Sequence, residues 1–250
     1  MRIHRFFIKT PIGEDDHLVI KESALIHQWR DVFRYTTGAR MVFFDGTGNE
    51  YLVLLERINP DRAEFAVLER KSGMAEEAKK TSKERQVWLG AALIKNDNFD
   101  WILQKATELG VSGIFPIIAE RSIKKELNQE RSLRIVQEAS EQSGRLDIPQ
   151  VEEPKKLIET LEYFEERFGG KGGGKVIVCQ GGKDSMTWAK GGKKIMSGKG
   201  PLLFLVGPEG GWSPKEIEYF DKKKYVKVVI GKNVLRAETA AVSILALSQI

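Results

Sequence analysis

The sequence predicts a small β domain over residues 1–72, a linker over 73–85 and an α/β domain over 86–250. Residues 1–72 consist mostly of short segments rich in β-branched and aromatic residues, as strands are. Residues 73–85 are polar and contain almost no large apolar side chain, which is typical of a linker. From residue 86 onward, apolar runs alternate with amphipathic segments. Because these runs are continuously apolar, they favour a parallel sheet that is covered on both faces.

The N-terminal part contains five expected strands and one helix. Residues 22–34 are expected to be helical because their apolar positions recur at helical spacing. Gly46-Thr47-Gly48-Asn49 is a plausible hairpin turn between two strands. Several short strands with one helix predict a small β-barrel. The expected strands are RIHRFFI, HLVI, RMVFFD, EYLVLLERI and AEFAVLER.

The C-terminal part reads as alternating strands and helices, without an internal repeat. Gly110 is expected to cap the first of these helices at its C-terminus. The expected strands are QVWLGAAL, GIFPII, KVIVCQ, PLLFLV and YVKVVI. Helices are expected over residues 96–109, 129–143, 154–168, 214–220 and from 237 to the C-terminus.

The composition bounds the class of protein. Hydrophobic residues make up 41% and charged residues 30%, as in folded globular proteins rather than disordered ones. No apolar run approaches the roughly 20 residues of a membrane helix, so no membrane partner is expected. The single cysteine, Cys179, excludes an intrachain disulfide and suggests a reducing compartment, so a cytoplasmic location is expected. The histidines His4, His17 and His27 have no partner at metal-ligand spacing, and no metal site is predicted.

The charge distribution suggests a polyanionic partner without requiring one. The net charge is +5, and residues 169–200 alone hold seven lysines against one aspartate. The same segment is rich in glycine, so a flexible, solvated loop is at least as consistent with it as a binding surface.

A glycine-rich turn, Gly207-Pro208-Glu209-Gly210-Gly211, joins an apolar strand to a helix start. Ser213-Pro214-Lys215-Glu216 is a capping box with proline at the first helical position. Neither a Walker A loop nor a dinucleotide-binding fingerprint is present. Glu209 is a carboxylate at the carboxyl end of a strand, where α/β sheets bind ligands. A tight structural turn with a solvated glutamate is the alternative.

A second strand ends at Gly231, and a short loop leads through Arg236 to a helix that starts near Glu238 and Thr239. Two successive strand–glycine–helix units are expected to place two loops side by side and form a cleft. Arg236 and Glu238 could instead form a surface ion pair. Two further groups of polar residues stand out. Lys105 and Glu108 lie on an otherwise apolar helix, with Arg121 and Ser122 after the next strand, and the second group lies at a helix end before Pro149: Glu141, Gln142 and Arg145.

Taken together, QKATELGV, ERS, EQSGR–IP, GPEGGWSPKE and IGKNVLRAETA, with RIHRFF at the N-terminus, make the chain similar to a known family. They resemble the RsmE-type 16S ribosomal RNA uridine-N3 methyltransferases of the SPOUT class, in the family's order and over nearly the whole chain. Asn233 stands where family members commonly carry arginine, so the chain departs from the family pattern at this position.

The resemblance implies a C-terminal SPOUT domain with a deep trefoil knot that binds S-adenosylmethionine, and an N-terminal PUA-like barrel that binds RNA. It also implies a homodimer that acts on 16S rRNA or the 30S subunit. By position in the two knot loops, the cofactor-binding residues would be Val206, Gly207, Pro208, Glu209, Gly210, Gly211, Ile230, Gly231, Val234, Leu235, Arg236, Glu238, Thr239 and Ala240.

The implied reaction needs a uracil N3 that has lost its proton. Glu209 is the candidate base, and Arg236 or Arg145 the candidate cation that stabilises the resulting anion. Methylation at carbon 5 would instead call for a cysteine nucleophile, but Cys179 closes a strand, where a buried structural role is more common. The RNA-contacting candidates are Arg2, Arg5, Lys105, Arg121 and Arg145. A SPOUT enzyme with another RNA target and a non-enzymatic RNA-binding assembly protein are the rival interpretations.

Overall fold

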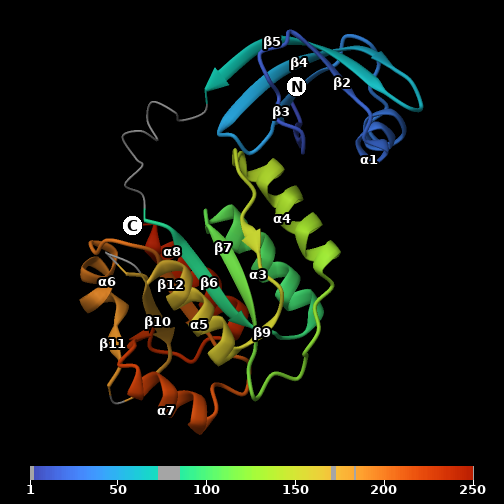
Figure 1. Cartoon of the computed structure of the whole chain (residues 1–250). Coiled ribbons are helices and arrows are strands. Elements are labelled where there is room, and N and C mark those ends of the chain that lie inside the picture. The colour runs from blue at the N-terminus through green and yellow to red at the C-terminus, as the bar shows by residue number, and fades with distance from the viewer. Residues whose placement is uncertain (1–2, 73–84, 170–172, 183, 250) are drawn as a thin grey trace. The chain divides into compact units, whose positions relative to one another are not determined.

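The computed structural model describes residues 3–72, 85–169, 173–182 and 184–249 (Figure 1). The chain divides into two compact units, Met1–Lys83 with Ser140–Ile148, and Glu84–Ala139 with Pro149–Ile250. The expected linker residues 73–84 and the candidate Arg2 lie outside the described residues.

Residues 140–148 group with the N-terminal unit, although the sequence predicted them in the larger domain. They contact residues of that unit that are far away in sequence. The Phe7 N–H donates to Glu141 Oε1 over 3.1 Å. The Arg5 Nη2 donates to the Gly144 and Arg145 carbonyl oxygens over 3.4 and 3.3 Å. These partners are more than 130 positions apart in sequence, so local patterns could not reveal the grouping.

The first unit is built on a five-stranded sheet in the order β1-β3-β4-β5-β2. β1 and β3 run parallel and the other neighbours antiparallel. The expected hairpin is confirmed, because β3 and β4 pair on either side of a turn in which Gly46 and Gly48 have positive φ. The strands are β1 (Arg5–Phe7), β2 (His17–Ile20), β3 (Arg40–Phe44), β4 (Asn49–Ile58) and β5 (Ala63–Ser72).

The expected helix over residues 22–34 has two parts. It begins as α1 (Ser23–His27) and continues as the π-helical η1 (Gln28–Val32), in which the Phe33 N–H donates to the Gln28 carbonyl. Trp29 is fully buried there and stacks on Phe43, with ring centroids 5.4 Å apart. Helical periodicity therefore located the segment, but it did not indicate the π-helical part, where Trp29 is buried.

The second unit contains an eight-stranded sheet with the order β11-β13-β10-β12-β6-β7-β8, and β9 also pairs with β7. Every pairing is parallel, which confirms the expected parallel sheet. The strands are β6 (Val87–Ala92), β7 (Gly113–Ile118), β8 (Gln150–Val151), β9 (Lys155–Lys156), β10 (Lys175–Cys179), β11 (Met186–Thr187), β12 (Leu202–Val206) and β13 (Val226–Val229).

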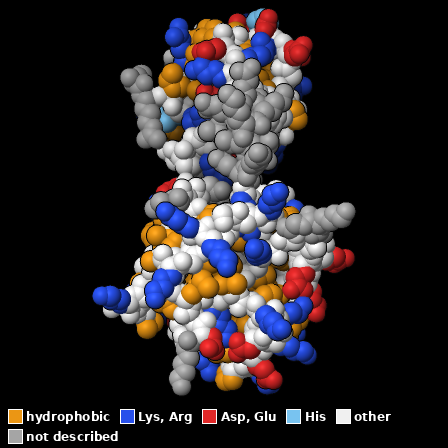
Figure 2. Space-filling model, turned by 90° about the vertical axis from the view of Figure 1, so that its left-hand side faces the viewer, with side chains coloured by type: hydrophobic (Ala, Val, Ile, Leu, Met, Phe, Trp, Pro, Cys, Tyr) orange, Lys and Arg blue, Asp and Glu red, His pale blue; other side chains and the backbone are white. Residues whose placement is uncertain are grey.

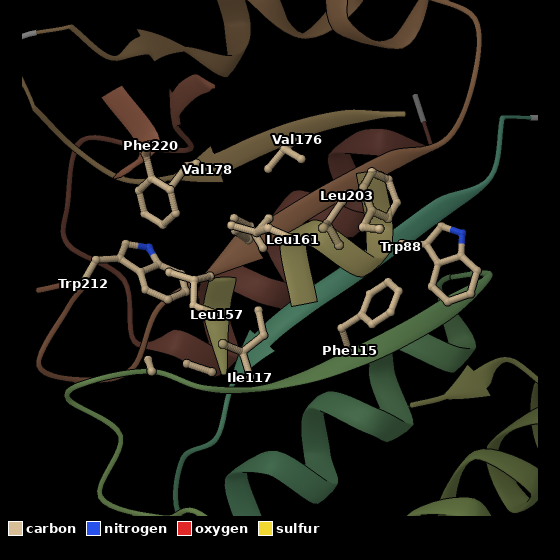
Figure 3. Packing of buried hydrophobic residues seen from close by; sticks show 14 residues of the cluster. Trp88, Phe115, Ile117, Leu157, Leu161, Val176, Val178, Leu203, Trp212 and Phe220 are labelled. Carbon is tan, nitrogen blue, oxygen red and sulfur yellow. The ribbon is translucent and has the colours of Figure 1, made fainter. Parts of the chain in front are cut away.

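Helices cover both faces of this sheet. On one face, α5 and α7 pack onto Leu203 and Leu205 in a buried cluster (Figure 3). Phe204 lies between these two leucines, so its side chain points to the other face, where Trp188 of α6 packs against it with ring centroids 5.8 Å apart. The helices are α3 (Asn96–Glu108), α4 (Gln129–Ser143), α5 (Leu157–Phe168), α6 (Trp188–Met196), α7 (Pro214–Lys222) and α8 (Ala237–Ser248).

The lysine-rich segment, which the sequence left open between a flexible loop and a binding surface, contains β11 and α6. Its glycines permit close packing: a Cβ on Gly192 would lie 2.6 Å from the Trp188 ring, and one on Gly191 would lie 2.1 Å from the Met186 sulfur. The Arg85 guanidinium donates to the carbonyl oxygens of Ile195, in the last turn of α6, and of Lys199 and Gly200 after it. A basic side chain from outside the segment thus holds the helix end in place.

None of the described helices is long and apolar enough to cross a membrane. Within the described ranges, no group of three or more His, Cys, Asp or Glu side chains could hold a metal ion.

Candidate functional site

The carboxyl ends of β10, β12 and β13 surround two adjoining cavities, with volumes of about 460 Å³ and 260 Å³. β10 pairs in parallel with both other strands, so the three strand ends lie at one edge of the sheet. The larger cavity alone is within the size range of small-molecule sites. Both cavities are lined by Cys179, Gln180, Gly181, Val234, Leu235 and Ala240.

The first wall of the larger cavity is the glycine-rich turn after β12. The Gly211 N–H donates to the Pro208 carbonyl over 2.8 Å and closes a tight turn in which Gly211 has φ of 68°. A side chain at Gly211 would be strained in this left-handed conformation. A Cβ on Gly207 would lie 3.1 Å from the buried Trp212 indole, so this glycine lets the ring pack close to the backbone.

The capping box that follows the turn is confirmed, and its Glu216 also accepts a hydrogen bond from outside α7. Ser213 Oγ accepts from the Glu216 N–H over 3.2 Å, and Glu216 Oε2 accepts from the Ser213 N–H over 2.7 Å. Glu216 Oε1 accepts a further hydrogen bond, 3.0 Å long, from the Glu120 N–H after β7. Beside it, Arg121 Nη1 donates to the Gly210 carbonyl over 2.8 Å. Two contacts from the β7 loop therefore position the glycine-rich turn.

The second wall is the loop from Ile230 to the first turn of α8. Arg236 is the N-cap residue of α8, but its side chain makes no capping hydrogen bond. The side chains of Glu209 and Arg236 are exposed, and neither forms a hydrogen bond or ion pair with another described residue. The alternative ion pair between Arg236 and Glu238 is likewise not formed among the described residues. The larger cavity thus has one carboxylate and one guanidinium on its walls, both available to a ligand.

Most of the predicted cofactor-binding residues line the two cavities. Gly210, Glu238 and Thr239 are the exceptions. The Gly210 carbonyl is held by Arg121, Thr239 is exposed, and Glu238 Oε2 is buried without a hydrogen-bond partner in the described part of the chain. The predicted residues at the cavities are Val206, Gly207, Pro208, Glu209, Gly211, Ile230, Gly231, Val234, Leu235, Arg236 and Ala240.

A third contributor to the site, Cys179-Gln180-Gly181 at the end of β10, was not predicted. The loops after β12 and β13 were expected to be neighbours, but β10 lies between those strands. Gln180 Oε1 is buried and has no hydrogen-bond partner among the described residues. The available signal was a polar Gln-Gly-Gly sequence directly after a buried strand.

Burial raises the pKa of the Cys179 thiol to about 12. The side chain therefore stays protonated near neutral pH, and a protonated thiol is a poor nucleophile. Its position at the cavity does not make it an activated cysteine.

The remaining candidates are dispersed. Arg145 groups with the first unit and forms a bidentate ion pair with Asp147, with N–O distances of 3.2 and 2.8 Å. It lines neither cavity. Arg5 is mostly buried and pairs with Glu50 over 2.5 Å. Lys105 pairs with Glu108 over 2.7 Å on α3. Within the second unit, the structure brings Glu209 and Arg236 together at one cavity.

Comparison with known proteins identifies the family. A model of the RNA methyltransferase domain matches residues 81–249. The ribosomal RNA small subunit methyltransferase E of Synechocystis is 30% identical over 220 residues, covering 87% of this chain and 68% of that protein. The protein of that name from Rickettsia conorii is 26% identical over 98% of this chain and 95% of its own. A crystal structure of the Neisseria gonorrhoeae ribosomal RNA small subunit methyltransferase E bound to S-adenosylmethionine superimposes with a TM-score of 0.82 at 26% identity, covering 99% and 97% of the two chains. The chain belongs to the RNA methyltransferase domain family, as an RsmE-type member.

Proposed function

We propose that the protein transfers the methyl group of S-adenosylmethionine to N3 of a uridine in the 16S rRNA of the small ribosomal subunit. The observation that carries this proposal is the larger cavity, which both family-matching loops line at the carboxyl ends of β12 and β13. The similarity to ribosomal RNA small subunit methyltransferase E proteins supports the substrate class.

The cavity walls suit S-adenosylmethionine. Val206, Leu235 and Ala240 offer apolar contact for an adenine ring. Gln180 Oε1 and Trp212 Nε1 are buried polar atoms without partners among the described residues, and a buried polar group is costly unless a ligand or water satisfies it. The glycine-rich turn gives a ligand close access to backbone groups.

When bound, S-adenosylmethionine supplies an electrophilic methyl group on its sulfonium. The residues of the chain then have two tasks. In the proposal, Glu209 takes the proton from uracil N3, because it is an unpaired carboxylate on the wall of the cavity. Arg236 stabilises the negative charge that develops on the base. We favour Arg236 over Arg145 because Arg236 lines the cavity.

We further propose the architecture and assembly that the family implies. The loops after β12 and β13 would form a deep trefoil knot, and the sheet of the first unit would close as a PUA-like barrel that binds RNA. A homodimer would complete each active site, with the 30S subunit or 16S rRNA as substrate. The sheet order supports the knot proposal, because β12 lies between the earlier strands β10 and β6.

A deletion strain tests the proposed function. We expect N3-methyluridine to disappear from the nucleosides of its 16S rRNA, as measured by mass spectrometry, and to return when the gene is restored. Unchanged N3-methyluridine would refute the proposed target. Calorimetry with S-adenosylmethionine separates an enzyme from a pure RNA-binding protein, since the latter would give no saturable heat.

Glu209→Gln tests the proposed base. We expect methyl transfer to 30S subunits to slow by about 10²–10⁴-fold, the usual contribution of a general base, with little change in the affinity for S-adenosylmethionine. Glu218→Gln is the matched control, because Glu218 is exposed on α7 and lines neither cavity. Near-normal turnover of Glu209→Gln would eliminate Glu209 as the base.

A further inference from the structure

The α6 lysine face, defined as Lys190, Lys193 and Lys194, is an exposed strip of positive charge on the second unit. These positions are three and four residues apart, so their side chains emerge on the same side of the helix. The opposite side of α6 is buried through Trp188, Gly191, Gly192 and Ile195. One side of the helix therefore packs against the rest of the unit, while the other presents the three lysines and Ala189 to solvent.

The charge on this face is not neutralised within the protein. Among the described residues, Lys190, Lys193 and Lys194 form no ion pair and no side-chain hydrogen bond. Lys175 and Lys199 nearby in the chain are also exposed and without an ion pair in the described ranges. Lys105 and Lys223 do pair, with Glu108 and Glu165 over 2.7 Å each, whereas exposed Lys156, Lys215 and Lys222 form no ion pair in the described ranges; what distinguishes α6 is that three such lysines share one side of one helix.

The surface around the α6 lysine face also carries positive charge. A Cβ on Gly198 would lie 3.3 Å from Lys175 Nζ and 3.2 Å from Arg85 Nη1, so two more cations approach each other after α6. Figure 2 views the second unit from the side on which α6 lies in Figure 1, and Lys and Arg side chains gather there around a small apolar area. Mutual repulsion of such charges is unfavourable in the isolated protein, and a polyanion would relieve it.

The face is also held rigidly. Arg85 binds the Ile195 carbonyl in the last turn of α6 and two carbonyls shortly after the helix, and Trp188 packs on Phe204 of β12. Lysines on an ordered helix lose less backbone conformational entropy on binding than lysines on a flexible loop would. The sequence left open whether this lysine-rich segment is a solvated loop or a binding surface. Its α6 part is an ordered helix with a basic side.

We propose that the α6 lysine face binds the phosphate backbone of the RNA substrate, independently of base sequence. This inference rests on the proposed function for the class of polyanion, since an RNA methyltransferase must hold a substrate with one negative charge per nucleotide. Lysine contacts of this kind supply affinity and position rather than base recognition. The face would anchor rRNA on the catalytic unit itself, in addition to any contact made by the first unit.

The test is the triple variant Lys190→Gln/Lys193→Gln/Lys194→Gln, with a 16S rRNA transcript as the probe. We expect the slope of log K against log [KCl] to become shallower by about 2, because each phosphate contact contributes roughly 0.7–0.9 to this slope. At about 0.1 M salt, this corresponds to roughly 100-fold weaker binding. The KM for methyl transfer should rise with little change in kcat, and calorimetric binding of S-adenosylmethionine should be unchanged.

A matched control removes the same charge from the opposite face of the sheet. Lys156→Gln/Lys215→Gln/Lys222→Gln changes three exposed lysines at the starts of α5 and α7 and at the end of α7. The triple arginine variant of the α6 lysine face should retain the salt slope. An unchanged slope in the α6 glutamine variant, or an equal change in the control, would overturn the proposal. Failure of wild-type protein to bind S-adenosylmethionine or to methylate 16S rRNA would refute the proposed function instead, so the two failures are distinguishable.

Discussion

Glu216→Gln is the most direct test of how the candidate site is held together. Glu216 is only 7% exposed, and its two carboxylate oxygens accept from two different backbone N–H groups, those of Ser213 and Glu120. One bond closes the capping box of α7, and the other ties the loop after β7 to the glycine-rich turn. Glutamine has the same shape but only one acceptor oxygen, so its NH₂ group must face one of the two N–H donors.

The expected cost follows from this geometry. One charge-assisted hydrogen bond is lost, and one buried N–H is left without an acceptor, which together destabilise by about 1–3 kcal/mol. For a unit of this size, the melting temperature should fall by about 2–12 °C. Affinity for S-adenosylmethionine should fall as well, because the turn that Glu216 positions forms one wall of the larger cavity.

The assay is thermal unfolding by circular dichroism, followed by calorimetric titration with S-adenosylmethionine. Glu218→Gln on the same helix is the control, because this side chain is exposed and a surface substitution of this kind changes stability by about 0.5 kcal/mol or less. Equal melting temperatures for the Glu216 and Glu218 variants would show that the double acceptor role of Glu216 does not stabilise the site, and the reasoning would fail.

Two further predictions concern the cavity walls. Gly211→Ala should destabilise the protein by about 1–2 kcal/mol, because the φ of 68° at this position is left-handed. Gly231→Ala is the control and should not destabilise it, because φ is not positive there and a Cβ would meet only open space. Equal urea unfolding midpoints for the two variants would contradict the predicted strain at Gly211. The Cys179 thiol, with a pKa of about 12, should react with iodoacetamide at pH 8 about a thousandfold more slowly than an ordinary cysteine, because far less of it is thiolate. Its alkylation rate, followed by mass spectrometry, should still rise at pH 10 and should match that of an ordinary cysteine in denaturant. Rapid reaction of the native protein at pH 8 would instead show an activated cysteine and would favour methylation at carbon 5.

Local chemistry allowed several features to be predicted from the sequence. The Gly46–Asn49 hairpin depends on positive φ at glycine, and the Ser213–Glu216 capping box depends on side chains three residues apart. The helix over residues 129–143 and the strand over 113–118 were predicted with the bounds they have in the structure, because each has a long and consistent pattern. The cavity-lining residues of the two family-matching loops were predicted through the resemblance, because matching motifs show where in the chain the family's loops lie.

The sequence by itself determined the class of the fold and the two loops that carry the candidate chemistry, since periodicity, turn residues and caps act over a few positions. Only the tertiary structure decided that β10 lies between β12 and β13 and brings Gln180 to the cavity. It also decided that Arg145 pairs with Asp147 and groups with the first unit, and that Arg85 binds the end of α6 from more than 100 residues away. Strand order and such distant contacts follow from how separate segments bury their apolar faces together, and no local pattern in the chain records that outcome.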